Sequence, residues 1–195
     1  MVFISLFFAA TFLNKINIGI RYILPVYPFL YLFTALAVAY VAAENLKRKA
    51  AALSLVAALA LYHMVSSWVT YPSYISYFNE FIGSSRKADT YLIDSNLDWG
   101  QDLKRLGMWV NDNNIPYINV IYFGGGEPAY YLGARANILR TVPLPIRPGY
   151  YAVSRHLYRL SSYSKGKKGM IDLEAYFRNA GYVSTIGNSI YIFKY

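Results

Sequence analysis

Residues 22–43 read YILPVYPFLYLFTALAVAYVAA, and residues 50–71 read AAALSLVAALALYHMVSSWVTY. The first run carries no charged side chain, and the second is interrupted only by His63. A helix rises about 1.5 Å per residue, so each run is long enough to cross the ~30 Å apolar core of a bilayer. Pro25 and Pro28 fall in the first turns of the first run, where a missing amide donor costs least. The two runs therefore predict two transmembrane helices.

The composition divides the chain at the end of the second run. Overall 56% of the residues are hydrophobic and 15% are charged, against about 25% charged in an ordinary soluble domain. The formal charge is +9. Beside apolar runs of this length, that charge favours a lipid bilayer and lipid phosphates as partners and no nucleic acid. The sequence contains no cysteine, which excludes disulfides, thiolate metal sites and cysteine nucleophiles.

The first residues of the sequence are also apolar. Residues 1–13 carry no charge, but they are fewer than the ~20 residues that a span needs. A signal peptide is the competing interpretation, although no positively charged leader precedes the apolar stretch. We expect the end of a helix whose beginning is missing, either because the gene is truncated or because it is split upstream.

Positive charge sets the expected orientation of the two helices. Three cations lie in the connection 44–49 between the runs, whereas the loop 14–21 carries two. The positive-inside rule therefore places residues 44–49 in the cytoplasm and residues 72–195 on the other side. The sequence thus predicts a multi-pass cell membrane protein with an extracytoplasmic C-terminal domain.

After Tyr71 short strands and helices alternate, which predicts a small α/β domain over residues 72–195 behind the helical membrane part. The expected helices are 98–113, with its apolar face on Leu103, Leu106, Trp109 and Val110, then 127–132, and 172–180 ended by Gly181. The expected strands are 117–123, 150–154, and a hairpin of 182–186 and 189–193 around Gly187 and Asn188. Residues 161–169 are polar and glycine-rich, which is typical of a surface loop.

The most distinctive polar cluster is DSNLDWGQD at 94–102. Asp98 and Gln101 have the spacing of a capping box at the start of a helix. Trp99 beside Gln101 also suits stacking on a sugar ring and hydrogen-bonding to it. Capping and sugar binding both remain open for this cluster.

The same segment has part of the spacing of a calcium-binding loop. Asp94, Asn96 and Asp98 alternate as the ligands of such a loop do, but Trp99 stands where the loop needs glycine and Arg105 where it needs glutamate. Calcium binding of this type is therefore disfavoured. We predict no cofactor, and a divalent cation of another kind is left open.

Three further features have ordinary structural explanations beside functional ones. The GGGEP at 124–128 lies between a strand and a helix, as a phosphate-binding turn would, but Glu127 would repel an anion, so a plain turn is favoured. His63 suits a polar contact between helices, and neither it nor His156 has neighbours that would complete a metal site. Arg21 lies at the membrane surface, where it serves either as an interfacial anchor or as a bidentate ligand of a lipid phosphate.

Three segments resemble a known family: NIGIRYILPVYP at 17–28, YPSYISYFNE at 71–80 and DSNLDWGQDLK at 94–104. They are similar to the C-terminal part of polyprenol-phosphate-dependent glycosyltransferases, which are multi-spanning GT-C enzymes such as family 39 protein mannosyltransferases and aminoarabinose transferases. The segments occur in the family's order, and the resemblance covers about residues 14–131. It implies transfer of a sugar from a dolichyl- or undecaprenyl-phosphate donor to an extracytoplasmic acceptor, by an inverting mechanism.

The resemblance also directs the choice of site residues. The family's catalytic carboxylate lies in an early extracytoplasmic loop of a longer chain, and nothing in this sequence corresponds to it, so the catalytic residue is unknown. The alternative to a transferase is a non-enzymatic, membrane-anchored module that binds a glycan or a protein through its 21 tyrosines. Candidate substrate- or donor-binding residues are Asn17, Arg21, Tyr22, Asn79, Glu80, Asp94, Asn96, Asp98, Trp99 and Gln101.

Overall fold

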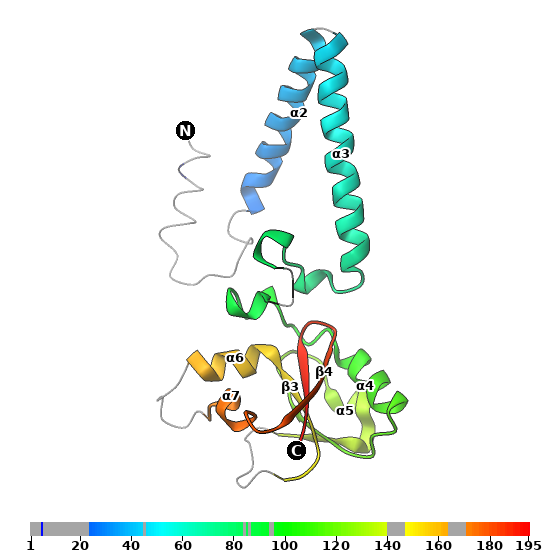
Figure 1. Cartoon of the computed structure of the whole chain (residues 1–195), viewed down its shortest axis with the longest axis vertical. Coiled ribbons are helices and arrows are strands. Elements are labelled where there is room, and N and C mark those ends of the chain that lie inside the picture. Colours follow the sequence, from blue (N-terminus) through cyan, green and yellow to red (C-terminus); the bar gives the residue numbers. More distant parts are fainter. Residues whose placement is uncertain are drawn as a thin grey trace. The chain divides into compact units, whose positions relative to one another are not determined.

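The computed structural model describes residues 5, 24–44, 46–83, 85, 87–93, 96–139, 147–163 and 171–195. The chain forms two compact units, Met1–Tyr74 and Ile75–Tyr195, and Figure 1 labels most of their helices and two of the strands. Apart from Ser5, the expected partial helix 1–13 lies outside the described residues. The same holds for four candidate site residues, Asn17, Arg21, Tyr22 and Asp94.

The first unit contains two long helices that pack side by side, α2 (Tyr27–Glu44) and α3 (Leu46–Thr70) (Figure 1). The predicted helical runs are thus confirmed as helices, with Pro28 in the first turn of α2. The predicted connection 44–49 is wrong, because α3 already begins at Leu46. Residues 46–49 contain no glycine or proline, and leucine, lysine and arginine all favour the helix.

Both helices are long and apolar enough to cross a membrane. None of the 25 residues of α3 is buried, and the structure describes this helix over its whole length. Large apolar side chains such as Leu36 and Leu59 are more than half exposed. A helix that is apolar on all sides is typical of a buried core helix or of a membrane span, and here the protein itself does not bury it.

The second unit is built on a five-stranded mixed sheet with the strand order β2-β1-β3-β5-β4. β1 lies parallel to both β2 and β3, whereas β5 lies antiparallel to β3 and to β4. The strands are β1 (Ile118–Ile121), β2 (Ala136–Ile138), β3 (Tyr150–Ser154), β4 (Gly181–Ile186) and β5 (Ile190–Lys194).

Helices cover both faces of the sheet. Val120 of β1 belongs to one core cluster with residues of α4 (Leu103–Asp112) and α5 (Pro128–Leu132). Val153 of β3 belongs to a second cluster, beside α6 (Arg155–Tyr163) and α7 (Leu173–Tyr176). Successive strand residues point to opposite faces, so the central strands are apolar on both sides. The predicted small α/β domain is therefore confirmed.

Several predicted boundaries differ from the structure. The strands expected at 117–123 and 150–154, the helix at 127–132 and the hairpin all form, whereas α6 and β2 were not predicted. The helix expected at 98–113 begins only at Leu103, and the one expected at 172–180 is reduced to α7. Gly181 begins β4 instead of ending that helix, and residues 161–163 of the expected loop belong to α6, while 164–169 lie outside the described residues.

Candidate functional site

The polar segment before α4 meets the carboxyl end of β3. The Asp98 carboxylate accepts hydrogen bonds from the Ser154 hydroxyl, at 2.5 Å, and from the backbone N–H of Gly100, at 2.8 Å. The Asp102 carboxylate accepts from the Ser189 hydroxyl, at 2.7 Å. Each of the two aspartates is only 1% exposed. Both carboxylates therefore join the 98–102 loop to the sheet and to the β4–β5 turn.

The two buried aspartates repel each other. The pKa of Asp98 is raised to about 6, mainly by burial and also by the charge of Asp102, and the hydrogen bonds from Ser154 and Gly100 oppose this rise. The group therefore keeps a proton at a pH where an exposed aspartate has lost it.

The capping box expected at Asp98 and Gln101 is not formed. Asp98 lies five residues before Leu103, the first residue of α4, and its bond to Gly100 closes a local turn. The Gln101 side chain accepts from the backbone N–H of Trp99 and donates to the carbonyl of Leu97. The predicted helix start is wrong because Gly100 has φ +79°, which interrupts the helical backbone just after Asp98.

The glycine-rich turn 124–126 packs directly against this loop. A Cβ added at Gly124 would lie 2.7 Å from the carbonyl oxygen of Trp99, and a Cβ at Gly100 would overlap the ring of Tyr122. The Tyr122 hydroxyl accepts from the N–H of Gly126 at 3.1 Å. The Glu127 side chain caps α5. The glycines thus permit close backbone approach, which agrees with a plain turn.

The remaining described candidate residues are Asn79, Glu80, Asn96 and Trp99. Trp99 is 49% exposed, and Asn96 donates to the carbonyl of Ile93 at 3.4 Å. Asn79 and Glu80 are exposed at the start of a short 3-10 helix, Glu80–Ile82. The described candidates therefore come from two segments of the chain, 79–80 and 96–101.

A buried charge cluster that the sequence did not predict lies beside the end of β3. The Arg155 guanidinium donates to Asp89 Oδ1 at 2.6 Å, and Arg159 donates to Asp89 Oδ2 at 2.8 Å. The hydroxyl of Tyr191 also donates to Asp89, at 2.9 Å. Arg155 donates besides to the carbonyls of Ser85 and Asn188. Through these hydrogen bonds the cluster connects Ser85 and Asp89 with α6 and with the β4–β5 turn.

Electrostatics in the cluster favour the ionised form of Asp89 and the neutral form of Tyr191. Burial alone would raise the pKa of Asp89, but the hydrogen bond from Arg159 and the charge of Arg155 outweigh it and lower that pKa. Burial and the neighbouring Asp89 raise the pKa of the Tyr191 hydroxyl to about 12. Two cations thus share one carboxylate, and the tyrosine stays neutral.

A pocket of about 550 Å³ opens beside this cluster. The ring of Tyr182 is 60% exposed, and its hydroxyl lies 2.7 Å from that of Thr185. The volume of the pocket lies in the range of small-ligand sites, and its lining combines aromatic with polar groups. The lining residues are Arg155, Tyr182, Thr185, Gly187, Asn188 and Tyr191.

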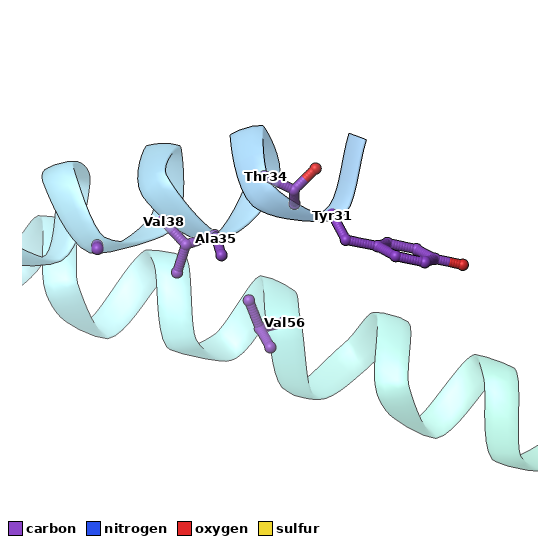
Figure 2. Close-up of a pocket in the computed structure, with 6 residues that line it drawn as sticks. Tyr31, Thr34, Ala35, Val38 and Val56 are labelled. Carbon is purple, nitrogen blue, oxygen red and sulfur yellow. The ribbon is translucent and has the colours of Figure 1, made fainter. Parts of the chain in front are cut away.

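A second, apolar groove of about 450 Å³ lies between α2 and α3 (Figure 2). Figure 2 shows Val38 and Ala35 of α2 on the side that faces Val56 of α3. Small side chains leave space between the helices here. The lining residues are Tyr31, Thr34, Ala35, Val38, Ala39 and Val56.

Within the described part of the chain, no group of three or more histidine, aspartate or glutamate side chains is arranged to hold a metal ion. His156 instead stacks its ring on Phe123, with the ring centroids 4.1 Å apart. No protein-family model, no curated protein and no solved structure matches the chain.

Proposed function

We propose that this chain is the C-terminal part of a membrane glycosyltransferase, which transfers a sugar from a dolichyl- or undecaprenyl-phosphate donor to an extracytoplasmic acceptor. The observation that carries the proposal is the joining of two span-length apolar helices to an α/β domain with an aromatic, polar pocket. A lipid-linked sugar combines an apolar chain with a polar ring, so the apolar helices suit its chain and the polar pocket suits its sugar. The resemblance of segments 17–28, 71–80 and 94–104 supports the same class.

In this proposal α2 and α3 cross the bilayer. The exposure of their apolar side chains supports it, because lipid tails can solvate the side chains that the protein leaves uncovered. Residues 47–49, at the start of α3, then lie in the cytoplasm and the α/β domain lies outside.

The donor lipid would lie along the helix pair. The groove between α2 and α3 is lined almost entirely by carbon, so it suits part of an isoprenoid chain. Arg21 would bind the phosphate, for which a planar guanidinium provides two parallel hydrogen bonds.

The pocket beside Tyr182 would take a sugar ring. The exposed tyrosine ring offers a flat apolar surface for stacking, and Thr185 and Asn188 offer polar groups for sugar hydroxyls. In the transfer step the bond from the sugar's anomeric carbon to the donor phosphate breaks and a bond to the acceptor oxygen forms. The acceptor hydroxyl releases its proton to water, and polyprenyl phosphate leaves with the electron pair of the broken carbon–oxygen bond.

The test is a transfer assay in proteoliposomes that contain undecaprenyl-phosphate-linked radiolabelled sugars. The full chain is assayed alone and together with the product of an adjacent upstream reading frame that encodes further spans. We expect labelled acceptor only with both proteins, and a large loss of transfer for Tyr182→Ala but not for Tyr130→Ala, an exposed tyrosine outside the pocket. The absence of transfer with every donor and with any upstream partner would contradict the proposal.

The same pocket supports one alternative, a membrane-anchored module that binds glycans without catalysis. Under this alternative, the full chain in nanodiscs binds an oligosaccharide array through Tyr182 but no partner confers transferase activity. Alkyl glycoside detergents would compete for such a pocket, so the binding measurement needs a detergent without sugars during preparation.

A further inference from the structure

The segment that follows α3 presents apolar side chains to the surroundings. Phe81 is 95% exposed, and Ile75 and Tyr77 are each at least two-fifths exposed. Phenylalanine is a residue that folded proteins normally bury, and three such side chains within seven residues form an unusual apolar surface. Residues 75–82 are called the juxtamembrane segment below.

The juxtamembrane segment is attached to the α/β domain by its backbone and its one small polar residue. Ser76 is fully buried; its carbonyl accepts from the Ser85 hydroxyl and its hydroxyl accepts from the Asn188 amide at 3.0 Å. Asn188 lies in the β4–β5 turn, and Arg155 donates to its carbonyl. The segment is therefore held at defined points of the domain while Ile75, Tyr77 and Phe81 remain exposed.

Chain connectivity limits how far this segment can lie from the end of α3. Ile75 follows Thr70, the last residue of α3, by five residues, and an extended chain spans at most about 3.6 Å per residue, or roughly 18 Å here. If α3 crosses the bilayer, Ile75 must lie close to the membrane surface. Tyrosine and phenylalanine are suited to that region, because the ring enters the acyl boundary while polar neighbours remain in the headgroups.

We propose that the juxtamembrane segment inserts Ile75, Tyr77 and Phe81 into the interfacial layer of the bilayer and so fixes the α/β domain against the membrane surface. This inference rests on the proposed membrane location of α3. Asn79 and Glu80 then lie among the lipid headgroups, where their polar side chains stay hydrated. Through Ser76 and Asn188, the contact also sets the distance of the Tyr182 pocket from the membrane.

The test measures the depth of spin labels in the full chain, reconstituted in vesicles of phosphatidylcholine and phosphatidylglycerol. The chain has no cysteine, so single cysteines carry nitroxides at position 81, at position 36 in α2 and at position 117, before β1. Tyr117 is half exposed at the opposite end of β1 from the carboxyl edge of the sheet. Collisions with lipid-soluble oxygen and with a water-soluble nickel chelate report the depth of each label.

We expect oxygen to relax the labels at 36 and 81 several-fold more than the nickel chelate does, and the reverse at 117. A label at 81 in water with the label at 36 in lipid would overturn the inference while leaving the membrane span intact. Labels at both 36 and 81 in water would overturn the proposed membrane location as well. Labels at both 81 and 117 in lipid would show adsorption of the whole domain, and would overturn the role of this segment.

A second variant tests whether Phe81 holds the segment at the interface. With the label at position 77, Phe81→Asp should increase collisions with the nickel chelate several-fold, because a carboxylate resists entry into the acyl boundary. Tyr117→Asp, which changes an exposed aromatic residue far from the segment, should leave the label at 77 unchanged. An unchanged label at 77 in both variants would overturn the anchoring role of Phe81.

Discussion

The helix pair and the α/β domain use the same apolar residue types in opposite ways. In α3 most of the large apolar side chains are exposed, and none of the helix's residues is buried. In the α/β domain the apolar side chains of the central strands point to both faces of the sheet and fill two cores, and the buried Asp89 and Arg155 form an ion pair. The difference indicates that the two regions are built for different surroundings, and the predictions below test it through the cost of equivalent substitutions.

The largest effect is expected from Arg155→Ala. The substitution leaves Asp89 buried, with Arg159 and Tyr191 as its partners among the described residues. Breaking a buried ion pair in this way typically costs about 3–5 kcal/mol. Urea unfolding of the full chain in micelles, followed by Trp109 fluorescence with Trp68 and Trp99 changed to phenylalanine, measures the loss. Lys104→Ala, an exposed cation on α4, is the control and should change stability little.

The next effect compares one leucine from each region. Leu106 in α4 is fully buried, so Leu106→Ala should lower the free energy of unfolding of the domain by about 2–5 kcal/mol. Leu59 in α3 is 59% exposed, and Leu59→Ala should have little effect because lipid or detergent fills the space. The same unfolding experiment measures both, with circular dichroism at the helix band for α3. Equal costs at the two positions would contradict the contrast between the regions.

Stability should also depend on the pH through Asp98. Its pKa rises from 3.8 to about 6 on folding, so the folded chain holds this proton more tightly than the unfolded chain. The stability from this group is fully present below pH 3.8 and is lost as the pH rises towards 6. Two pKa units correspond to about 3 kcal/mol. Asp98→Asn should remove this loss of stability. If the Asp98→Asn variant is no more stable than the parent chain at pH 7, the predicted effect of Asp98 is contradicted.

The smallest effect on folding is expected at Trp99. Because the ring is half exposed, Trp99→Ala should change the free energy of unfolding by less than about 1 kcal/mol. If Trp99 stacks on a sugar, Trp99→Phe should retain much of the transfer activity and Trp99→Ala little of it. Proteoliposome assays and thermal unfolding of the same samples separate the two effects. Loss of folding in Trp99→Ala would identify a core role instead.

Sequence reasoning predicted the elements whose signals are local. The apolar face of α4 follows from the helical spacing of Leu103, Leu106 and Val110, all of which are buried. The β4–β5 hairpin follows from apolar strands around a glycine with φ +55°. By contrast α6 begins with Arg155 and His156, a polar start that gives no apolar signal. Arg155 is buried beside Asp89, which lies 66 residues earlier and accepts its hydrogen bond.

The candidate site was predicted less well for the same reason. Residues 94–102 stand out by composition, yet the roles of Asp98 and Asp102 depend on Ser154 and Ser189, which lie far along the chain. The pocket residues Tyr182 and Thr185 come from an edge strand whose composition is ordinary. One local feature of the sequence could have indicated the pocket, namely that a cation, Arg155, directly follows the buried strand β3.

The central claim is that α2 and α3 cross a membrane and hold the α/β domain on its outer side. Single cysteines at positions 48 and 117 of the cysteine-free chain, treated with a membrane-impermeant thiol reagent, test it most directly. The account predicts labelling at 117 in intact cells and at 48 only after the membrane is permeabilised. Labelling at 48 but not at 117 would invert the orientation, and equal labelling of both from one side would contradict the crossing itself.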